Sequence, residues 1–128
     1  MRFKAKVRSG KEEAQDYLEM DGYQAGIEQI LGFKPFPGTL NLEVDNDTYR
    51  ELKEGSVQRL ESFKANGEHY PGGFLYPISV EGEEAAVLEP DITDHPPELL
   101  EVVAENKLRS KIKAQDGDTL VCKTRKLV

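Results

Sequence analysis

The sequence is poor in the residues that build disulfides, zinc sites and membrane spans. A single cysteine, Cys122, stands among 128 residues, which excludes an internal disulfide and suits a reducing cytoplasm. One cysteine and two distant histidines, His69 and His95, cannot supply the ligands of a zinc site. No run of about 18 apolar residues is present, and the N-terminus lacks the apolar core of a signal peptide. We therefore expect a cytoplasmic protein with no membrane segment.

Basic residues are also in the minority, with 17 Lys and Arg against 24 Asp and Glu and a net charge of −7. Broad nucleic-acid binding depends on neutralising phosphates, so we expect no nucleic-acid partner. A nucleotide ligand remains open, because a local basic cluster or a metal ion can bind one. The Walker phosphate loop and the dinucleotide G-x-G-x-x-G motif are both absent, so phosphate binding would need another device. The two histidines have no local catalytic partner, and we expect both to be exposed.

What the sequence does contain is a series of short alternating segments separated by turn residues. Strands are expected over residues 2–8, 39–44, 73–80, 85–88, 98–104 and 119–123, with weaker strand patterns at 17–20 and 59–64. Asn66-Gly67 is a strong signal for a two-residue hairpin turn. This rhythm favours a mainly β, barrel-like fold over a doubly wound sheet. The length suits one domain over residues 1–128, which we expect to be monomeric.

One or two short helices are expected between the strands. Apolar residues at helical spacing predict a helix over residues 22–31, with Asp21 as its N-cap and Gly32 as its stop. A second short helix is expected over residues 106–112. Residues 45–54 are polar, and we expect a loop with one helical turn there.

A rigid turn between the first helix and the second strand is the strongest candidate for chemistry. Two prolines and two glycines in residues 32–38 restrict the path of the backbone. Thr39 and Asn41 follow at the start of a strand, where side chains two residues apart share a face. A hydroxyl and an amide oxygen there are neutral ligands that hard cations accept. Thr39 and Asn41 could equally be turn or capping residues that hydrogen-bond to their own backbone. The pattern alone therefore leaves both the metal-binding and the structural interpretation open.

Two further segments carry groups suited to phosphates. Residues 9–11 read Ser-Gly-Lys directly after the first strand, where backbone N–H groups and a lysine could meet an anion. Lys107 and Arg109 fall at the start of the second short helix. Each signal is weak when it is taken alone, because lysine and arginine in an acidic protein are commonly solvent-facing charges.

Taken together in order, the motifs resemble those of the archaeal CTP-dependent riboflavin kinases. The most specific is the Pro37-Gly38-Thr39-Leu40-Asn41 run. The agreement begins at residue 31 and continues through Asn66-Gly67, Pro77-Ile78, Thr93 with His95, residues 98–104, Lys107-Leu108-Arg109 and Asp116-Gly117-Asp118. It covers nearly the whole chain.

The resemblance implies a six-stranded cradle-loop barrel that transfers the γ-phosphoryl group of CTP to the 5′-hydroxyl of riboflavin, giving FMN and CDP. It implies that Thr39 and Asn41 bind Mg²⁺ and that Thr93 and Glu101 contact the flavin, with Glu101 as the candidate base. It assigns nucleotide binding to two segments, Gly10, Lys11, Glu12, Glu13, Ala14, Gln15 and Asp16 in the first and Asn106, Lys107, Leu108 and Arg109 in the second. Some relatives carry an N-terminal DNA-binding domain, which we do not expect here because the chain opens at the first barrel strand.

One departure from the family pattern bears on activity. The first nucleotide segment usually reads Gly-x-Gly-Glu-Gly, whereas this chain has Glu12 and Ala14 at two of the glycine positions. Alanine resists a left-handed backbone by about 1 kcal/mol, and Glu12 adds a negative charge where a triphosphate would lie. An alternative is therefore a non-catalytic or altered-specificity relative that binds flavin or nucleotide.

Overall fold

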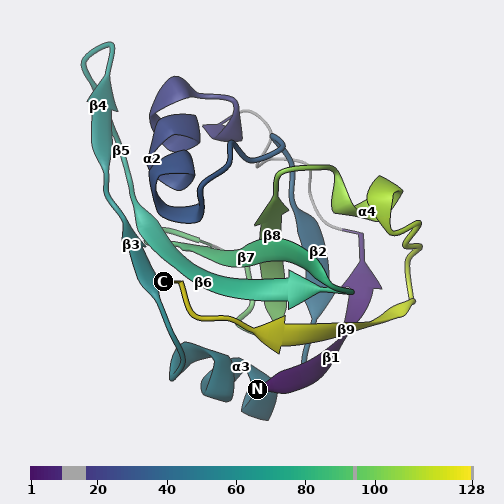
Figure 1. Ribbon diagram of the computed structural model, residues 1–128. Coiled ribbons are helices and arrows are strands. Elements are labelled where there is room, and N and C mark those ends of the chain that lie inside the picture. The colour runs from purple at the N-terminus through teal and green to yellow at the C-terminus, as the bar shows by residue number, and fades with distance from the viewer. Residues whose placement is uncertain (10–16, 94, 128) are drawn as a thin grey trace.

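The strands of the computed structural model close into a six-stranded antiparallel barrel (Figure 1). The structure describes residues 1–9, 17–93 and 95–127. The strands are β1 (Arg2–Arg8), β2 (Leu40–Glu43), β3 (Gln58–Leu60), β4 (Phe63–Ala65), β5 (Glu68–Tyr70), β6 (Gly73–Val80), β7 (Glu83–Pro90), β8 (Leu99–Ala104) and β9 (Thr119–Thr124). The ring runs β6-β7-β8-β2-β1-β9 and closes where β9 pairs with β6. The mainly β barrel expected from the sequence is confirmed.

The barrel interior is built by the alternation that the sequence shows. Every second residue of β1 is buried, and the inward-facing residues of all six barrel strands fill one apolar core. β2, β6, β7 and β8 also have buried residues on their outer face. A second apolar cluster lies on the outside of β6, β7 and β8, where α2 (Asp21–Leu31) packs against them. Tyr23 and Ile27 form the buried face of this helix. The outer surface of the barrel is therefore covered by a helix over β6, β7 and β8.

Two further helices and several turns complete the fold among the described residues. α3 (Asn46–Lys53) packs Leu52 into the barrel core, and α4 (Leu108–Lys111) does the same with Leu108. Gly32 ends α2 at φ +84°, as expected from the sequence. The Asn66-Gly67 pair has φ values of +53° and +80°, which suits the two-residue hairpin turn that was predicted.

Three local expectations are corrected. Residues 45–54 are mostly helical, because the Asp45 side chain caps α3 by accepting from the Thr48 N–H at 2.7 Å. Tyr17 and Leu18 are helical and form no strand, and Leu18 is buried in the cluster beneath α2. The N-cap of α2 is Met20, with Asp21 inside the first turn.

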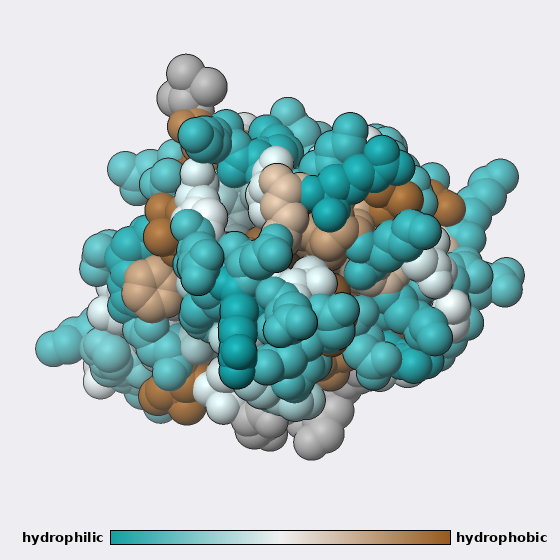
Figure 2. Space-filling model, turned by 90° about the horizontal axis from the view of Figure 1, so that it is seen from below, coloured by the Kyte–Doolittle hydropathy of each residue, from teal (hydrophilic) through white to brown (hydrophobic). Residues whose placement is uncertain are grey.

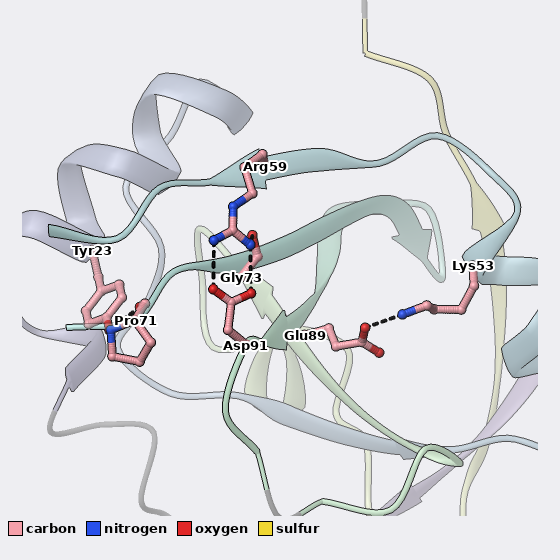
Figure 3. A network of polar contacts seen from close by, with 7 residues as sticks. All are labelled: Tyr23, Lys53, Arg59, Pro71, Gly73, Glu89 and Asp91. Carbon is pink, nitrogen blue, oxygen red and sulfur yellow. Dashed lines mark hydrogen bonds and ion pairs between the residues drawn. The ribbon is translucent and has the colours of Figure 1, made fainter.

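A polar network fixes the point where the chain leaves β7 (Figure 3). Arg59 of β3 forms two hydrogen bonds of 2.7 Å with Asp91, the residue directly after β7. Lys53 of α3 forms an ion pair with Glu89, which also accepts a hydrogen bond of 2.8 Å from the Tyr49 hydroxyl. These contacts hold the start of the loop that carries Thr93 and His95.

The surface seen from below the barrel is mostly hydrophilic, with hydrophobic side chains in small separate areas (Figure 2). The large hydrophobic residues that are exposed among the described ones are Met1, Val57, Phe74 and Ile92. No helix formed by the described residues is long and apolar enough to cross a membrane.

Candidate functional site

A row of polar side chains crosses the outside of the barrel on three neighbouring strands. Arg8 of β1 lies opposite Asn41 of β2, which lies opposite Glu101 of β8. The residues on either side of Asn41, Leu40 and Leu42, are buried in the barrel core, so the alternation turns Asn41 to the outer face. Arg8 and Glu101 occupy the same face by the same argument. Antiparallel register thus brings together residues that are 60 positions apart in the chain.

Two members of this row are buried, which is unusual for polar groups on a barrel exterior. Asn41 and Glu101 are each 6% exposed, and they are the buried polar or charged residues in the described part of the chain. The amide oxygen of Asn41 has no hydrogen-bond partner there. A buried acceptor without a partner costs about 1–3 kcal/mol. The arrangement therefore supplies an oxygen that is suited to a ligand or a cation.

The loop between β7 and β8 brings two more candidates to the row. The Nε2 atom of His95 lies 3.4 Å from Oε1 of Glu101, and the backbone N–H of His95 donates to Oγ1 of Thr93 at 3.1 Å. The side chain of His95 is only 18% exposed, and its Nδ1 atom is buried without a partner. The expectation of an exposed His95 is therefore wrong, whereas His69 is exposed as predicted.

The turn before β2 is held in place by hydrogen bonds from two directions. The Phe36 N–H donates to the Ala104 carbonyl at 2.7 Å, at the end of β8. The Gln24 side chain donates to the Pro35 carbonyl at 2.9 Å, which connects the turn to α2. Thr39 is half-buried directly before β2. That Thr39 and Asn41 share a face stays a prediction from their spacing.

A second polar cluster joins the end of β1 to α4. The Ser9 hydroxyl and the Arg109 guanidinium both donate to the carboxylate of Asp116, the latter at 2.6 Å. These hydrogen bonds, that of Ser9 first, lower the pKa of the Asp116 carboxyl. Two backbone bonds of 2.8 Å, between Val7 and residues 117 and 118, fix the Asp116 turn to the same strand.

This cluster places Arg109 of the second candidate nucleotide segment near Ser9, the residue directly after β1. Asn106 and Lys107 are exposed, and Leu108 is a core residue whose side chain faces the barrel interior. Residues 10–16 of the first candidate segment lie outside the described residues. Among the described residues, Ser9 and Arg109 are joined through the carboxylate of Asp116.

Sequence reasoning missed Arg8 and Asp116 and misjudged His95. Arg8 alternates with the buried Val7, so its outward direction was readable from the strand pattern. It forms an ion pair of 3.1 Å with Glu43, and this contact lowers the pKa of the Glu43 carboxyl. Asp116 and His95 gave no periodic signal, because each acts from a turn or a loop.

A separate hollow of about 710 Å³ lies between α2 and β3–β4 and contains none of the candidate residues. Its lining includes Gly22, Gly26, Arg59, Leu60 and Phe63. An added Cβ at Gly22 would lie 2.4 Å from the Phe63 ring, so this glycine allows the helix to approach closely. The hollow is separate from the polar row, where we place the candidate site.

The order of motifs along the chain agrees with a known family. The family model named CTP-dep_RFKase, described as a domain of unknown function, DUF120, matches residues 7–123. The chain belongs to this family. It is 41% identical over 123 residues to a riboflavin kinase of Methanosarcina acetivorans, which covers 94% of this chain and 52% of that protein.

Two further relatives are riboflavin kinases of other archaea. A riboflavin kinase of Ignicoccus hospitalis is 39% identical over 118 residues, covering 90% of this chain and 66% of that protein. A riboflavin kinase of Pyrobaculum aerophilum is 36% identical over 121 residues, covering 92% of this chain and 58% of that protein. The chain thus spans between about half and two thirds of the length of these curated relatives.

Proposed function

We propose that this chain is a riboflavin kinase domain that uses CTP and Mg²⁺ to convert riboflavin to FMN, with CDP as the second product. The observation that carries the proposal is the buried row of Asn41 and Glu101 with its unpartnered amide oxygen. Family membership and the names of the curated relatives support the same reaction.

The residues present fit a magnesium ion. The Asn41 oxygen lacks a partner among the described residues, and Thr39, two positions earlier, is half-buried and carries a hydroxyl group. The described residues contain no group of three or more His, Cys, Asp or Glu side chains that could hold a metal. Mg²⁺ is commonly bound by few protein groups together with water and substrate phosphates. When bound at Thr39 and Asn41, it would supply positive charge to the phosphates.

The remaining residues have roles in positioning and charge neutralisation, which are what phosphoryl transfer requires. Glu101 is a buried carboxylate that accepts hydrogen bonds from hydroxyl groups of riboflavin, and Thr93 adds a second flavin contact. Lys107 and Arg109, with residues 10–16, bind the nucleotide. In the reaction the 5′-oxygen bonds to the γ-phosphorus, the bond to the bridging oxygen of CDP breaks, and Glu101 is the candidate acceptor for the hydroxyl proton.

The direct test is to incubate the protein with riboflavin, Mg²⁺ and each of CTP, ATP, GTP and UTP, and to separate FMN from riboflavin by chromatography. We expect FMN with CTP and little with the other three. If ATP gives as much FMN as CTP does, the proposed riboflavin kinase activity stands and the proposed preference for CTP is wrong.

Glu12 and Ala14, which replace glycines of the family pattern, favour a second candidate function. In it the protein binds flavin or nucleotide without catalysing phosphoryl transfer. Thermal denaturation with CDP and with FMN, added separately, distinguishes the two, since a ligand bound to the folded state raises the melting temperature. The kinase predicts a shift with each ligand. A shift with FMN alone, together with no product, would favour the non-catalytic relative.

A further inference from the structure

The outer face of β1 carries a row of basic side chains in a chain whose net charge is −7. Every second residue of β1 faces the barrel core, so strand alternation places the residues between them on the outside. These outward residues are all basic, and the residue of β9 that lies opposite the first of them is a lysine. We call this set the β1 basic row: Arg2, Lys4, Lys6, Arg8 and Lys123.

Acidic side chains border the β1 basic row but leave most of it without a counter-charge. Glu43 of β2 forms an ion pair of 3.1 Å with Arg8 and lies opposite Lys6. On the other side, Glu81 accepts a hydrogen bond of 3.4 Å from the Val121 backbone N–H of β9. Apart from Arg8, the members of the row are exposed and form no ion pair with a described residue.

Keeping these like charges side by side costs stability. Arg2 and Lys123 lie directly opposite each other, and like charges in that position destabilise a sheet. Along β1, successive members of the row are about 7 Å apart, which is within the distance of about 8 Å over which exposed charges interact at physiological salt. An approaching anion relieves this repulsion, so the row matches a ligand that carries several negative charges.

The β1 basic row ends at the candidate site. Arg8 lies opposite Asn41, whose buried amide oxygen is the proposed magnesium ligand. From there the row extends for about 20 Å along β1, which lies between β2 and β9 (Figure 1). Of the two proposed substrates, CTP is strongly anionic and riboflavin is uncharged. The net charge of −7 repels an approaching nucleotide, whereas a positive row that leads to the site attracts it locally.

We infer that the β1 basic row steers the anionic nucleotide toward the Asn41 end of the polar row and thereby raises its association rate. The inference rests on the proposed function for the identity of the nucleotide. Lys4 lies about 14 Å from Arg8 along the strand, so it acts through its field before the nucleotide is bound. Such steering weakens as salt is added, because the Debye length falls from about 30 Å at 0.01 M to about 3 Å at 1 M.

Stopped-flow binding of a fluorescent CDP analogue with Mg²⁺ tests this without requiring turnover. Lys4→Glu reverses an exposed charge in the middle of the row, between two remaining cations that favour the new carboxylate, so the variant should fold. We expect its association rate at low salt to fall about two- to fivefold, with an unchanged dissociation rate. Lys4→Gln should give a smaller decrease. At about 1 M salt, all these proteins should associate equally fast.

Lys64→Glu is the matched control, because Lys64 is an exposed lysine in the middle of β4, on the hairpin that projects from the barrel (Figure 1). It changes the net charge by the same amount as Lys4→Glu and leaves the row intact, so its association rate should stay close to that of the wild type. Riboflavin, followed by its own fluorescence, should bind every variant at the wild-type rate because it is uncharged.

Three results would overturn the inference. Equal association rates for Lys4→Glu and Lys64→Glu at low salt would mean that net charge matters and its placement does not. A decrease that persists at about 1 M salt, or a change in the dissociation rate alone, would indicate direct contact in place of steering. A protein that binds no nucleotide refutes the inference together with the proposed function. A protein that binds the nucleotide but forms no FMN refutes the proposed function alone, and the same association rates still decide the role of the row.

Discussion

Replacing Asn41 by leucine should make the metal-free protein more stable while it abolishes magnesium-dependent turnover. The Asn41 side chain is 6% exposed, and its amide oxygen has no partner among the described residues. Leaving such an acceptor buried costs about 1–3 kcal/mol, and leucine has a similar volume without this cost. Most single substitutions destabilise a protein, so an increase in stability is a specific expectation.

The size of the effect can be worked out from the same numbers. If leucine recovers about 1–2 kcal/mol, the melting temperature should rise by roughly 3–8 °C for a domain of this size. The gain must be measured in EDTA, because a bound cation would satisfy the oxygen in the wild type. Adding Mg²⁺ with CDP should raise the melting temperature of the wild type and leave that of Asn41→Leu unchanged.

Thermal unfolding followed by circular dichroism, with and without Mg²⁺ and CDP, is the assay. Asn46→Leu is a control on an exposed asparagine at the start of α3, and it should change the free energy of unfolding by about 0.5 kcal/mol or less. A drop of several degrees for Asn41→Leu in EDTA would refute the reasoning. It would mean that the Asn41 oxygen has a structural partner in solution and is not reserved for a ligand.

Two other substitutions test the nucleotide side. Asp116→Asn should raise the KM for CTP about two- to fivefold and change the KM for riboflavin little, because the exposed Asp116 carboxylate orients Arg109 and Ser9. Steady-state kinetics of the variant and the wild type measure both constants. If the KM for CTP is the same in both proteins, Asp116 does not position the nucleotide. The folded-state pKa of Asp116 is lowered, so its stabilising effect should be present at neutral pH and begin to be lost as the pH falls below about 4. Once the pH is below the lowered folded-state pKa, Asp116→Asn and the wild type should melt alike. Glu12→Gly combined with Ala14→Gly should raise CTP affinity about fivefold, measured by calorimetry, since a left-handed alanine costs about 1 kcal/mol. No change would show that these positions do not limit CTP binding.

Much of the fold was readable from the sequence because its strands are apolar or alternating segments separated by turn residues. β1, β6, β8 and β9 follow the predicted segments closely, and Gly32 and Asn66-Gly67 adopt the backbone that their residue types favour. α3 was missed because it is polar, with Leu52 as its buried residue, and its capping by Asp45 resembles that of an ordinary turn.

The site was only partly predictable, because strand spacing is a local property whereas strand register and loop path are not. The spacing of Thr39 and Asn41 is enough to place them on one face, since strand alternation is local. That Asn41 lies opposite Glu101 depends on the register between β2 and β8, which are about 60 residues apart. The contact between His95 and Glu101 depends on the path of the β7–β8 loop, where no periodicity applies.

The central claim is that this chain phosphorylates riboflavin with CTP, and one measurement tests it most directly. A folded sample is incubated with riboflavin, CTP and Mg²⁺, and FMN and CDP are quantified over time, with Asn41→Leu in parallel. We expect equal amounts of FMN and CDP from the wild type, no product when EDTA is added, and none from the variant. Absence of FMN with every nucleoside triphosphate would contradict the claim.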